Sequence, residues 1–548
     1  MAEQSGRRVS AEIPLFGFLM IALLLSSLSW TVATNDEAIW HYIGWSWANG
    51  HAPYTMAVEN KGPGIFSLYA LSSLIFGIDF GPVRFVGSLA VWGTAVALCV
   101  LVRRRTNARA ALMTALIFGL VNCWTAVDAG FSDSTENFEV FFTTLAFVVA
   151  NSRPPTLSRA VMAGVLAGLA ISFKQSAIFT GAALLAALLL QAPSIMVFTS
   201  FVGGGLAGVV FFLVPALISG TRIGDYIQFS WLVLTYKGIS GAPSTGIRID
   251  SFLRTWSGPM RLFIPFAANF LLRRRSFLET GLWTPMVLWL GAGFVMVNSS
   301  GVTHPHQIKE ILAPLSVVAA LGVEQLIAVG GIRASAVVLV LVLAFFPDGA
   351  LEGFRHVPDY LFRYQVNERV FADVGSRQVT KVAALKGRVF SEDEFDFQMH
   401  NALGHAYDAI AAASHRDARF FGPIYTYEDV AMRDLGEYLR SHTGPSERIF
   451  VFGRGPAALA MLYSNRQSST RFFCNILLYG YNLKGNSKFL TLMLQELHAT
   501  PPVLLAIPLD ITAELPYTMP SWLQQLVSHG YSKVALRDGF AIYRRTVQ

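Results

Sequence analysis

Ionisable side chains stand at the ends of long apolar segments in this sequence. An acidic pair, Asp36 and Glu37, directly follows the apolar run 13–33, and Glu59, Asn60 and Lys61 precede the apolar run 65–77. Charged groups in or beside membrane segments are costly, so they are functional candidates by default. The other candidates are Asp133, Glu136, Lys174, Gln175, His304 and His306. Asp128, Glu139, Lys309 and Glu310 stand in the same neighbourhoods. Carboxylates and lysines gathered at one membrane surface suggest a site for an anionic, lipid-borne substrate.

Each candidate also has a purely structural explanation. Asp36 and Glu37 would serve to end a membrane span, and Lys61 would serve as a headgroup anchor. Asp133 suits a helix N-cap, with a glutamate three residues later as in a capping box. Lys174 is long enough to extend its ammonium to the interface. His304 and His306 fit a solvated loop, because a metal site needs more ligands than one His-x-His pair supplies.

The composition excludes an ordinary soluble enzyme. The chain has 548 residues, of which 53% are hydrophobic and 14% charged, and its mean hydropathy is +0.47. Soluble domains carry about 25% charged residues. The net charge of +7 comes largely from arginine clusters beside apolar segments, at 7–8, 103–105 and 273–275. Cytoplasmic ends of membrane spans show this bias, so it does not indicate nucleic-acid binding. Three cysteines are too few for a disulfide framework.

The apolar segments predict about eleven membrane spans, since a span needs about 20 mostly apolar residues. Their ranges are 13–33, 82–102, 108–126, 134–150, 158–173, 176–191, 195–218, 257–272, 280–298, 308–329 and 332–346. With a cytoplasmic N-terminus this count places every arginine cluster inside, as the positive-inside rule requires. It places residues 34–81, 127–133, 219–256, 299–307 and 347–548 outside. The segment 65–77 is too short to span and is expected to be an interfacial or re-entrant helix.

The fold class expected is therefore an α-helical polytopic membrane protein with a C-terminal extracytoplasmic α/β domain. Residues 1–346 form the membrane domain, with 34–81 as its first outer loop, and 347–548 form the soluble domain. Short apolar runs at 449–453 and 503–507 predict buried strands. Two runs at 533–537 and 540–545, separated by Asp538-Gly539, predict a hairpin. Residues 428–441 and 487–499 have helical spacing.

The chain resembles the polytopic GT-C glycosyltransferases, in the bacterial branch related to protein O-mannosyltransferases (glycosyltransferase family 39) and lipid A aminoarabinose transferases. The resemblance begins at the acidic pair after the first span and continues through the loop 41–64, HYIGWSWANGHAPYTMAVENKGPG. It includes Thr135-Glu136, Lys174-Gln175 and the tail segment 461–473, MLYSNRQSSTRFF. The family's lysine-proline-proline motif is Lys61-Gly62-Pro63 here, and Asn60 replaces the glutamate of the aminoarabinose branch.

The resemblance implies transfer of a sugar from a polyprenyl-phosphate donor to a glycolipid, polysaccharide or protein acceptor at the outer face of the bacterial inner membrane. It aligns the family's first-loop aspartate with Asp36, the expected general base, and its motif lysine with Lys61, which would hold the donor phosphate together with Lys174. Glu37, Asp133 and Glu136 are further catalytic candidates. Glu59, Asn60, Gln175, His304 and His306 are candidates for substrate binding.

Two other classes of function remain open at this point. A transporter or flippase of a lipid-linked sugar would favour broken helices near the midplane and inverted repeats, whereas the ionisable groups here are expected at one face and the sequence contains no repeat. A structural membrane protein with a partner-binding tail would leave the acidic pair and Lys61 unexplained. No resident metal site is predicted and no cofactor is called for, although a divalent metal ion stays an open alternative. The sequence does not identify the sugar, the acceptor or the oligomeric state.

Overall fold

The computed structural model describes most of the chain. The described residues are 12–29, 35–123, 134–151, 156–232, 260–272, 281–298, 305–344, 427–453, 455–474, 487–508, 521–528, 530–537 and 540–546. They divide into two compact units. The helical unit comprises Met1–Ser29, Asn60–Ser72 and Asp79–Phe354, and the sheet unit comprises Trp30–Glu59, Ser73–Ile78 and Arg355–Gln548.

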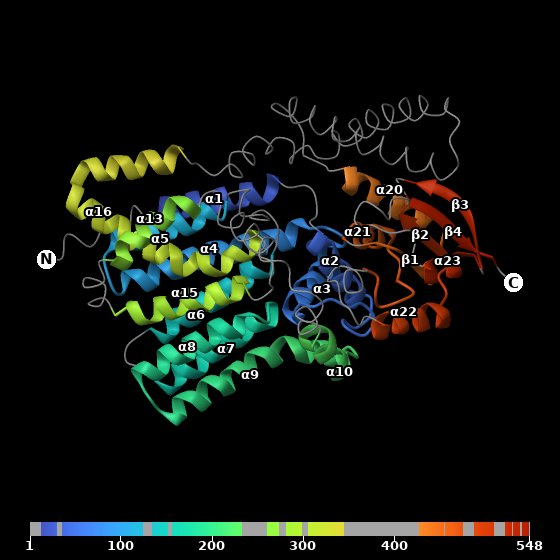
Figure 1. Ribbon diagram of the computed structural model, residues 1–548, viewed down its shortest axis with the longest axis horizontal. Coiled ribbons are helices and arrows are strands. Elements are labelled where there is room, and N and C mark those ends of the chain that lie inside the picture. The colour runs from blue at the N-terminus through green and yellow to red at the C-terminus, as the bar shows by residue number, and fades with distance from the viewer. Residues whose placement is uncertain are drawn as a thin grey trace. The chain divides into compact units, whose positions relative to one another are not determined.

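The helices of the helical unit lie where the sequence predicts apolar spans (Figure 1). Their bounds are α1 Glu12–Ser29, α4 Gly81–Arg103, α5 Ala108–Val121, α6 Thr135–Ala150, α7 Leu157–Phe173, α8 Ala177–Gln191, α9 Ile195–Ile218, α13 Met260–Leu272, α15 Trp283–Asn298 and α16 Lys309–Ala344. Gly331, at a φ of 59°, breaks α16 into two helical stretches, which match the last two predicted spans. The expectation of a mainly helical polytopic protein is confirmed.

Length and composition single out the strongest membrane-spanning candidates. Among the described residues, Gly81–Arg103, Ile195–Ile218 and Lys309–Gly331 are long and apolar enough to cross a membrane. Helix α9 keeps large apolar side chains exposed, including Leu206, Phe211 and Ile218. Apolar side chains on an exposed helix face are suited to lipid rather than to water. A helix can enter lipid because its backbone groups are already paired within the helix.

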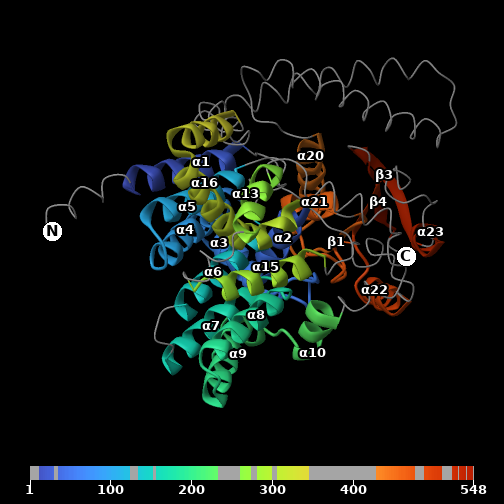
Figure 2. The same cartoon turned by 60° about the vertical axis from the view of Figure 1, so that its left-hand side comes forward.

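Close packing between α7 and α9 depends on glycine in both helices. A Cβ atom on Gly168 would lie 2.0 Å from the carbonyl oxygen of Gly205, and one on Gly204 would lie 2.2 Å from that of Val161. The two helices lie side by side in both views (Figures 1 and 2). Small residues at four-residue spacing let membrane helices approach closely, which strengthens van der Waals packing.

The segment 34–81 contains two helices, of which the sequence predicts one. Helix α2, Asn35–Ala48, starts with Asp36 and Glu37 in its first turn, where carboxylates interact favourably with the helix dipole. Helix α3, Pro63–Phe76, agrees with the short apolar helix expected over 65–77. The acidic pair therefore lies at the start of a second helix. The structural explanation that the pair merely ends the first span did not include this position.

The sheet unit contains a four-stranded mixed sheet in the order β1-β2-β4-β3 (Figure 1). The strands are β1 Ile449–Val451, β2 Leu504–Pro508, β3 Tyr531–Arg537 and β4 Phe540–Arg545, and only β1 and β2 are parallel. The helices are α20 Tyr427–Ser441, α21 Gly455–Ser464, α22 Ser487–Ala499 and α23 Ser521–Ser528. The predicted α/β tail and its hairpin are confirmed. Residues 347–426 lie outside the described residues.

Helix α2 packs within the sheet unit, against the segment that follows α21. The Tyr42 hydroxyl accepts from the Ser468 amide at 2.8 Å and donates to the Arg466 carbonyl at 3.4 Å. The Tyr42 and Phe473 ring centroids are 4.3 Å apart. Burial raises the pKa of the Tyr42 phenol, so it stays protonated and able to donate. The division of the chain at residue 346 stays a prediction, and the structure adds that α2 and the tail belong to one unit.

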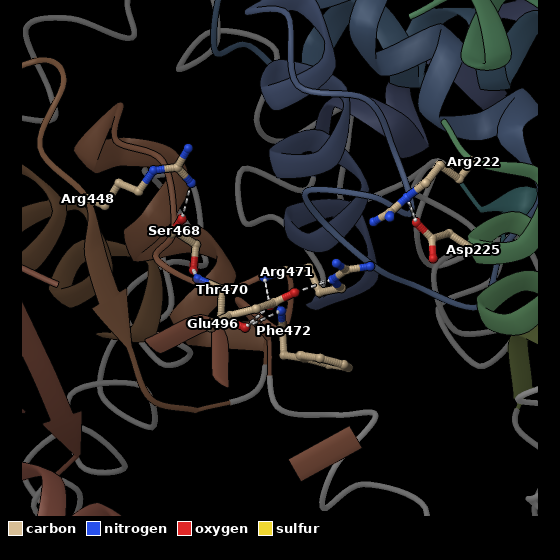
Figure 3. A network of polar contacts seen from close by, with 8 residues as sticks. All are labelled: Arg222, Asp225, Arg448, Ser468, Thr470, Arg471, Phe472 and Glu496. Carbon is tan, nitrogen blue, oxygen red and sulfur yellow. Dashed lines mark hydrogen bonds and ion pairs between the residues drawn. The ribbon is translucent and has the colours of Figure 1, made fainter. Parts of the chain in front are cut away.

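A carboxylate stabilises the tail segment that meets α2. Glu496 accepts hydrogen bonds from the Thr470 hydroxyl at 2.7 Å and from the Arg471 amide at 3.0 Å, and its other oxygen pairs with the Arg471 guanidinium at 2.5 Å (Figure 3). Arg448 donates to the Ser468 carbonyl at 2.9 Å (Figure 3). The Arg471 carbonyl in turn accepts from the Val58 amide. The segment is thus tied both to α22 and to the chain just before Lys61.

Candidate active site

A buried ion cluster connects three elements of the helical unit. The Lys174 ammonium lies 2.7 Å from Glu136 Oε1 and also contacts Glu310 Oε1. Lys174 ends α7 as its C-cap, Glu136 lies in the first turn of α6, and Glu310 lies in the first turn of α16. The Glu136 and Glu310 side chains are 2% and 0% exposed, and that of Lys174 is 13% exposed.

Neighbouring polar groups extend the cluster along α6. Lys309 is buried and donates to Ser134 Oγ at 3.1 Å and to Asn137 Oδ1 at 3.0 Å. Glu139, one turn after Glu136, is 1% exposed and accepts a 3.0 Å hydrogen bond from Thr143. Three buried carboxyl groups and two lysines therefore gather where α6 and α16 start and α7 ends. Buried charges are costly unless paired, so such a cluster requires a structural or functional reason.

The electrostatics of Lys174 favour its charged form. Burial lowers the pKa of its ammonium, but Glu136 and Glu310 more than offset this, and the pKa lies above the usual lysine value. A cation that is already neutralised by two carboxylates does not attract a further anion strongly. The phosphate contact predicted for Lys174 would therefore require it to exchange a carboxylate partner.

The chain that carries Lys61 packs against the end of α7. Gln175 Nε2 donates to the Asn60 carbonyl at 3.1 Å, and a Cβ atom on Gly62 would lie 2.0 Å from the Ser172 carbonyl oxygen. Asn60 and Gln175 are buried, whereas Lys61 is partly exposed. The structure thus brings the Lys61 main chain, Gln175 and the end of α7 together, as a single site requires.

The acidic pair formed by Asp36 and Glu37 lies in the sheet unit. Asp36 is partly exposed, Glu37 is fully buried, and Glu59 is 5% exposed. Asp133 and His304 lie outside the described residues, as does the side chain of His306. Among the described residues, no group of three or more His, Cys, Asp or Glu is arranged to hold a metal ion.

Glu139, Lys309 and Glu310 were not assigned to the site from the sequence, although they stand in the cluster. A signal for Glu139 exists, since Glu136 and Glu139 are three residues apart and share one helix face. For Lys309 and Glu310 the signal is their place at the start of an apolar run, beside the other candidates. Which of these ionisable residues contacts Lys174 depends on how the helices pack.

The comparisons with known proteins agree with this architecture. Residues 60–218 match the family model described as dolichyl-phosphate-mannose-protein mannosyltransferase. This range contains Lys61, Glu136, Lys174 and Gln175. No curated protein matches the sequence significantly.

Solved structures match nearly the whole chain. The crystal structure of ArnT from Cupriavidus metallidurans bound to undecaprenyl phosphate matches with a TM-score of 0.56 and 13% identity, over 98% of this chain and 99% of that one. Its apo form matches with a TM-score of 0.54 and 12% identity, over 98% of each chain. The Archaeoglobus fulgidus oligosaccharyltransferase with zinc and sulfate matches with a TM-score of 0.51 and 13% identity, over 96% of this chain and 73% of that one.

These matches establish the fold, and the family model adds a sequence relationship over part of the chain. The predicted resemblance to the polytopic GT-C glycosyltransferases is confirmed as a likeness of fold over nearly the whole chain and as a match to the mannosyltransferase family model over residues 60–218.

Proposed function

We propose that this chain, which has the fold of the GT-C glycosyltransferases, transfers a sugar from a polyprenyl-phosphate donor to an acceptor at the outer face of the bacterial inner membrane. The observation that carries the proposal is the match over 98% of the chain to an ArnT that binds undecaprenyl phosphate. The buried ion cluster beside the Lys61 loop supports it, because it places cations and carboxylates near one end of apolar helices. The acceptor is a glycolipid, a polysaccharide or a protein.

In the proposed reaction an acceptor hydroxyl attacks the anomeric carbon of the donor sugar. The new carbon–oxygen bond forms while the bond to the phosphate oxygen breaks, so the anomeric configuration inverts. Asp36 takes the proton from the hydroxyl as general base. The lysines stabilise the negative charge that develops on the leaving phosphate, which therefore needs no strong general acid. The transition state resembles that of glycoside hydrolysis, with positive charge at the sugar.

The remaining polar residues take supporting roles in this proposal. Lys61 holds the donor phosphate, and Lys174 joins it by exchanging one of its carboxylate partners for the phosphate. Glu136, with Glu37 and Asp133 as further candidates, holds the acceptor or stabilises the positive charge on the sugar. Glu59, Asn60, His304 and His306 remain candidates for contacts to the substrates. The polyprenyl tail stays in the bilayer, which explains why the reacting groups lie at the ends of apolar helices.

The test is turnover of the Asp36→Asn variant with a lipid-linked donor. The amide keeps the size of the side chain but cannot accept the proton, and loss of a general base costs about 10²- to 10⁴-fold in rate. Donor binding is expected to persist, because the phosphate contacts are assigned to lysines. A rate within a few-fold of the parent would remove Asp36 as the base and leave Glu37, Asp133 and Glu136 as alternatives.

A deletion strain identifies the substrates. Lipid mass spectrometry is expected to show accumulated donor and an under-glycosylated acceptor. A transporter or flippase would instead move the lipid-linked sugar between the two leaflets. Such a protein would not catalyse sugar transfer in detergent, where no leaflets exist. Sugar transfer by the purified full-length chain therefore separates the two functions.

A further inference from the structure

The main chain on either side of Lys61 is held by two side chains from elsewhere in the helical unit. Gln175 Nε2 donates to the Asn60 carbonyl at 3.1 Å, and Ser230 Oγ donates to the Lys61 carbonyl at 3.4 Å. Gln175 Nε2 also donates to Ser230 Oγ at 2.6 Å. Two side chains and two successive carbonyls thus form one connected network. Gln175 is 5% exposed and Ser230 is fully buried, so water does not replace these bonds.

A close contact fixes the next residue of the same loop. A Cβ atom on Gly62 would lie 2.0 Å from the Ser172 carbonyl oxygen, and one on Gly64 would lie 3.0 Å from the Phe173 ring. The loop therefore lies directly against the last turn of α7, and position 62 admits only glycine without a shift of the main chain.

Ser230 comes from an unusual element. Helix α10, Ile223–Tyr226, follows Arg222, which pairs with Asp225 at 3.0 Å (Figure 3). It continues into the π-helical segment η2, Ile227–Leu232. π-helical turns are rare and occur frequently at functional sites. Here the π-helical turn contains both buried Phe229 and buried Ser230, and it presents the serine hydroxyl to the Lys61 carbonyl.

We propose that Ser230 and Gln175 are positioning residues that set Lys61 for the donor phosphate, so that η2 controls donor affinity. The proposal rests on the phosphate role of Lys61 given under Proposed function. It reassigns Gln175 from substrate contact to support of the loop. The lysine ammonium stands at the end of a flexible four-carbon side chain. If the main chain of Lys61 were also mobile, ordering it on binding would cost free energy and weaken the charge-assisted contact to the phosphate.

The experiment compares full-length Ser230→Ala with the parent in two measurements. The first is the affinity for undecaprenyl phosphate in detergent. The second is the rate at which an amine-reactive reagent modifies Lys61, followed by peptide mass spectrometry. Ser230→Ala breaks the bonds to Lys61 and Gln175, and one or two neutral hydrogen bonds correspond to a change of about 3- to 30-fold in an equilibrium constant. We expect weaker phosphate binding in this range and a several-fold change in Lys61 modification.

The matched control is Ser67→Ala, because Ser67 donates only within its own helix, to the Pro63 carbonyl at 2.8 Å. It is expected to change neither measurement. The double variant Ser230→Ala, Lys61→Ala separates positioning from a general structural effect. If Ser230 acts through Lys61, the serine substitution causes no further loss of phosphate affinity once the lysine is removed.

Two results overturn the proposal. One is an unchanged rate of Lys61 modification in both Ser230→Ala and Gln175→Ala. The other is an equal loss of phosphate affinity from Ser230→Ala whether or not Lys61 is present. If Lys61→Ala alone binds undecaprenyl phosphate as the parent does, the phosphate role of Lys61 fails, and the modification rate still shows whether Ser230 and Gln175 hold the loop.

Discussion

Lys174 is shared by two carboxylates that come from different helices. Its contacts to Glu136 and Glu310 join residues that are 38 and 136 positions away in the sequence. Removing one partner of a buried ion pair leaves an uncompensated charge, which typically costs about 3–5 kcal/mol. The same removal lowers the competition for the Lys174 ammonium, so stability and phosphate affinity are expected to move in opposite directions.

Glu310→Gln tests this competition. We expect a lower free energy of unfolding, with a decrease of about 1–3 kcal/mol because the amide still occupies the site and Glu136 still pairs with Lys174. Affinity for undecaprenyl phosphate is expected to rise. Thermal unfolding in detergent and a binding titration measure the two effects. Glu324→Gln is the control on the same helix, since Glu324 pairs with the exposed Arg109 and such pairs contribute about 0–1 kcal/mol. Equal destabilisation by both substitutions would contradict the role assigned to the cluster.

The phosphate role of the two lysines is tested by Lys61→Ala and Lys174→Ala. Each variant is expected to bind undecaprenyl phosphate more weakly, because charge-assisted contacts are about twice as strong as neutral hydrogen bonds. Lys→Arg is expected to restore binding only in part, since a guanidinium fork and a compact ammonium differ in geometry. Lys174→Ala should also destabilise the fold, because it removes the ammonium that lies between two buried carboxylates. Parent-like affinity in both alanine variants would remove the lysines from the site.

At the scale of helices, the α7–α9 interface fixes the position of the end of α7. Lys174 caps this end, and the loop that carries Lys61 packs against it. Gly164 and Gly168 on α7 face Gly204 and Gly208 on α9, and none of them has room for a Cβ atom. Ser172, near the end of α7, also donates to the Gly208 carbonyl at 3.5 Å. A change in the spacing of these helices is therefore expected to reach the site as well as the fold.

Gly168→Ala is expected to destabilise the protein, because the added methyl group would lie 2.0 Å from the Gly205 carbonyl and the helices would have to separate. Gly203→Ala provides the matched control. No atom lies within 4 Å of a Cβ there, and alanine favours a helix over glycine by up to about 1 kcal/mol. Thermal unfolding of the two purified variants measures the difference. A melting temperature for Gly168→Ala at or above that of Gly203→Ala would show that the interface does not require glycine.

At the scale of the whole molecule, the sheet unit restricts the membrane topology. Helix α2 follows the first predicted span, and Tyr42 binds the tail through Ser468. Residues 35–59 and the tail must therefore lie on the same side of the membrane. The number of spans between them must be even, and the ten predicted from 82 to 346 satisfy this condition.

Reporter fusions test the topology directly. A reporter after Gln548 is expected to be active only outside the cytoplasm, and one at Arg274 only inside, since the arginine clusters favour the cytoplasmic side. A fusion within 49–51, after α2, should report the same side as the fusion at Gln548. Opposite sides for these two positions would contradict the structure of the sheet unit, whereas a shared cytoplasmic location would contradict the proposed orientation and, with it, transfer at the outer face.

The sequence by itself determined the apolar helices of the helical unit and the four strands, because the signals for them are local, but it did not predict α2. Apolar runs of sufficient length mark the spans, and Asp538-Gly539 between two short runs marks the hairpin that β3 and β4 form. It also identified Glu136 and Lys174 as ionisable residues at span ends. Only the tertiary structure paired Lys174 with Glu310, placed Ser230 on the Lys61 carbonyl and joined α2 to the tail. These contacts connect residues from 136 to more than 400 positions apart, and helix packing decides which of many polar groups meet, since periodicity along one segment carries no information about its partner.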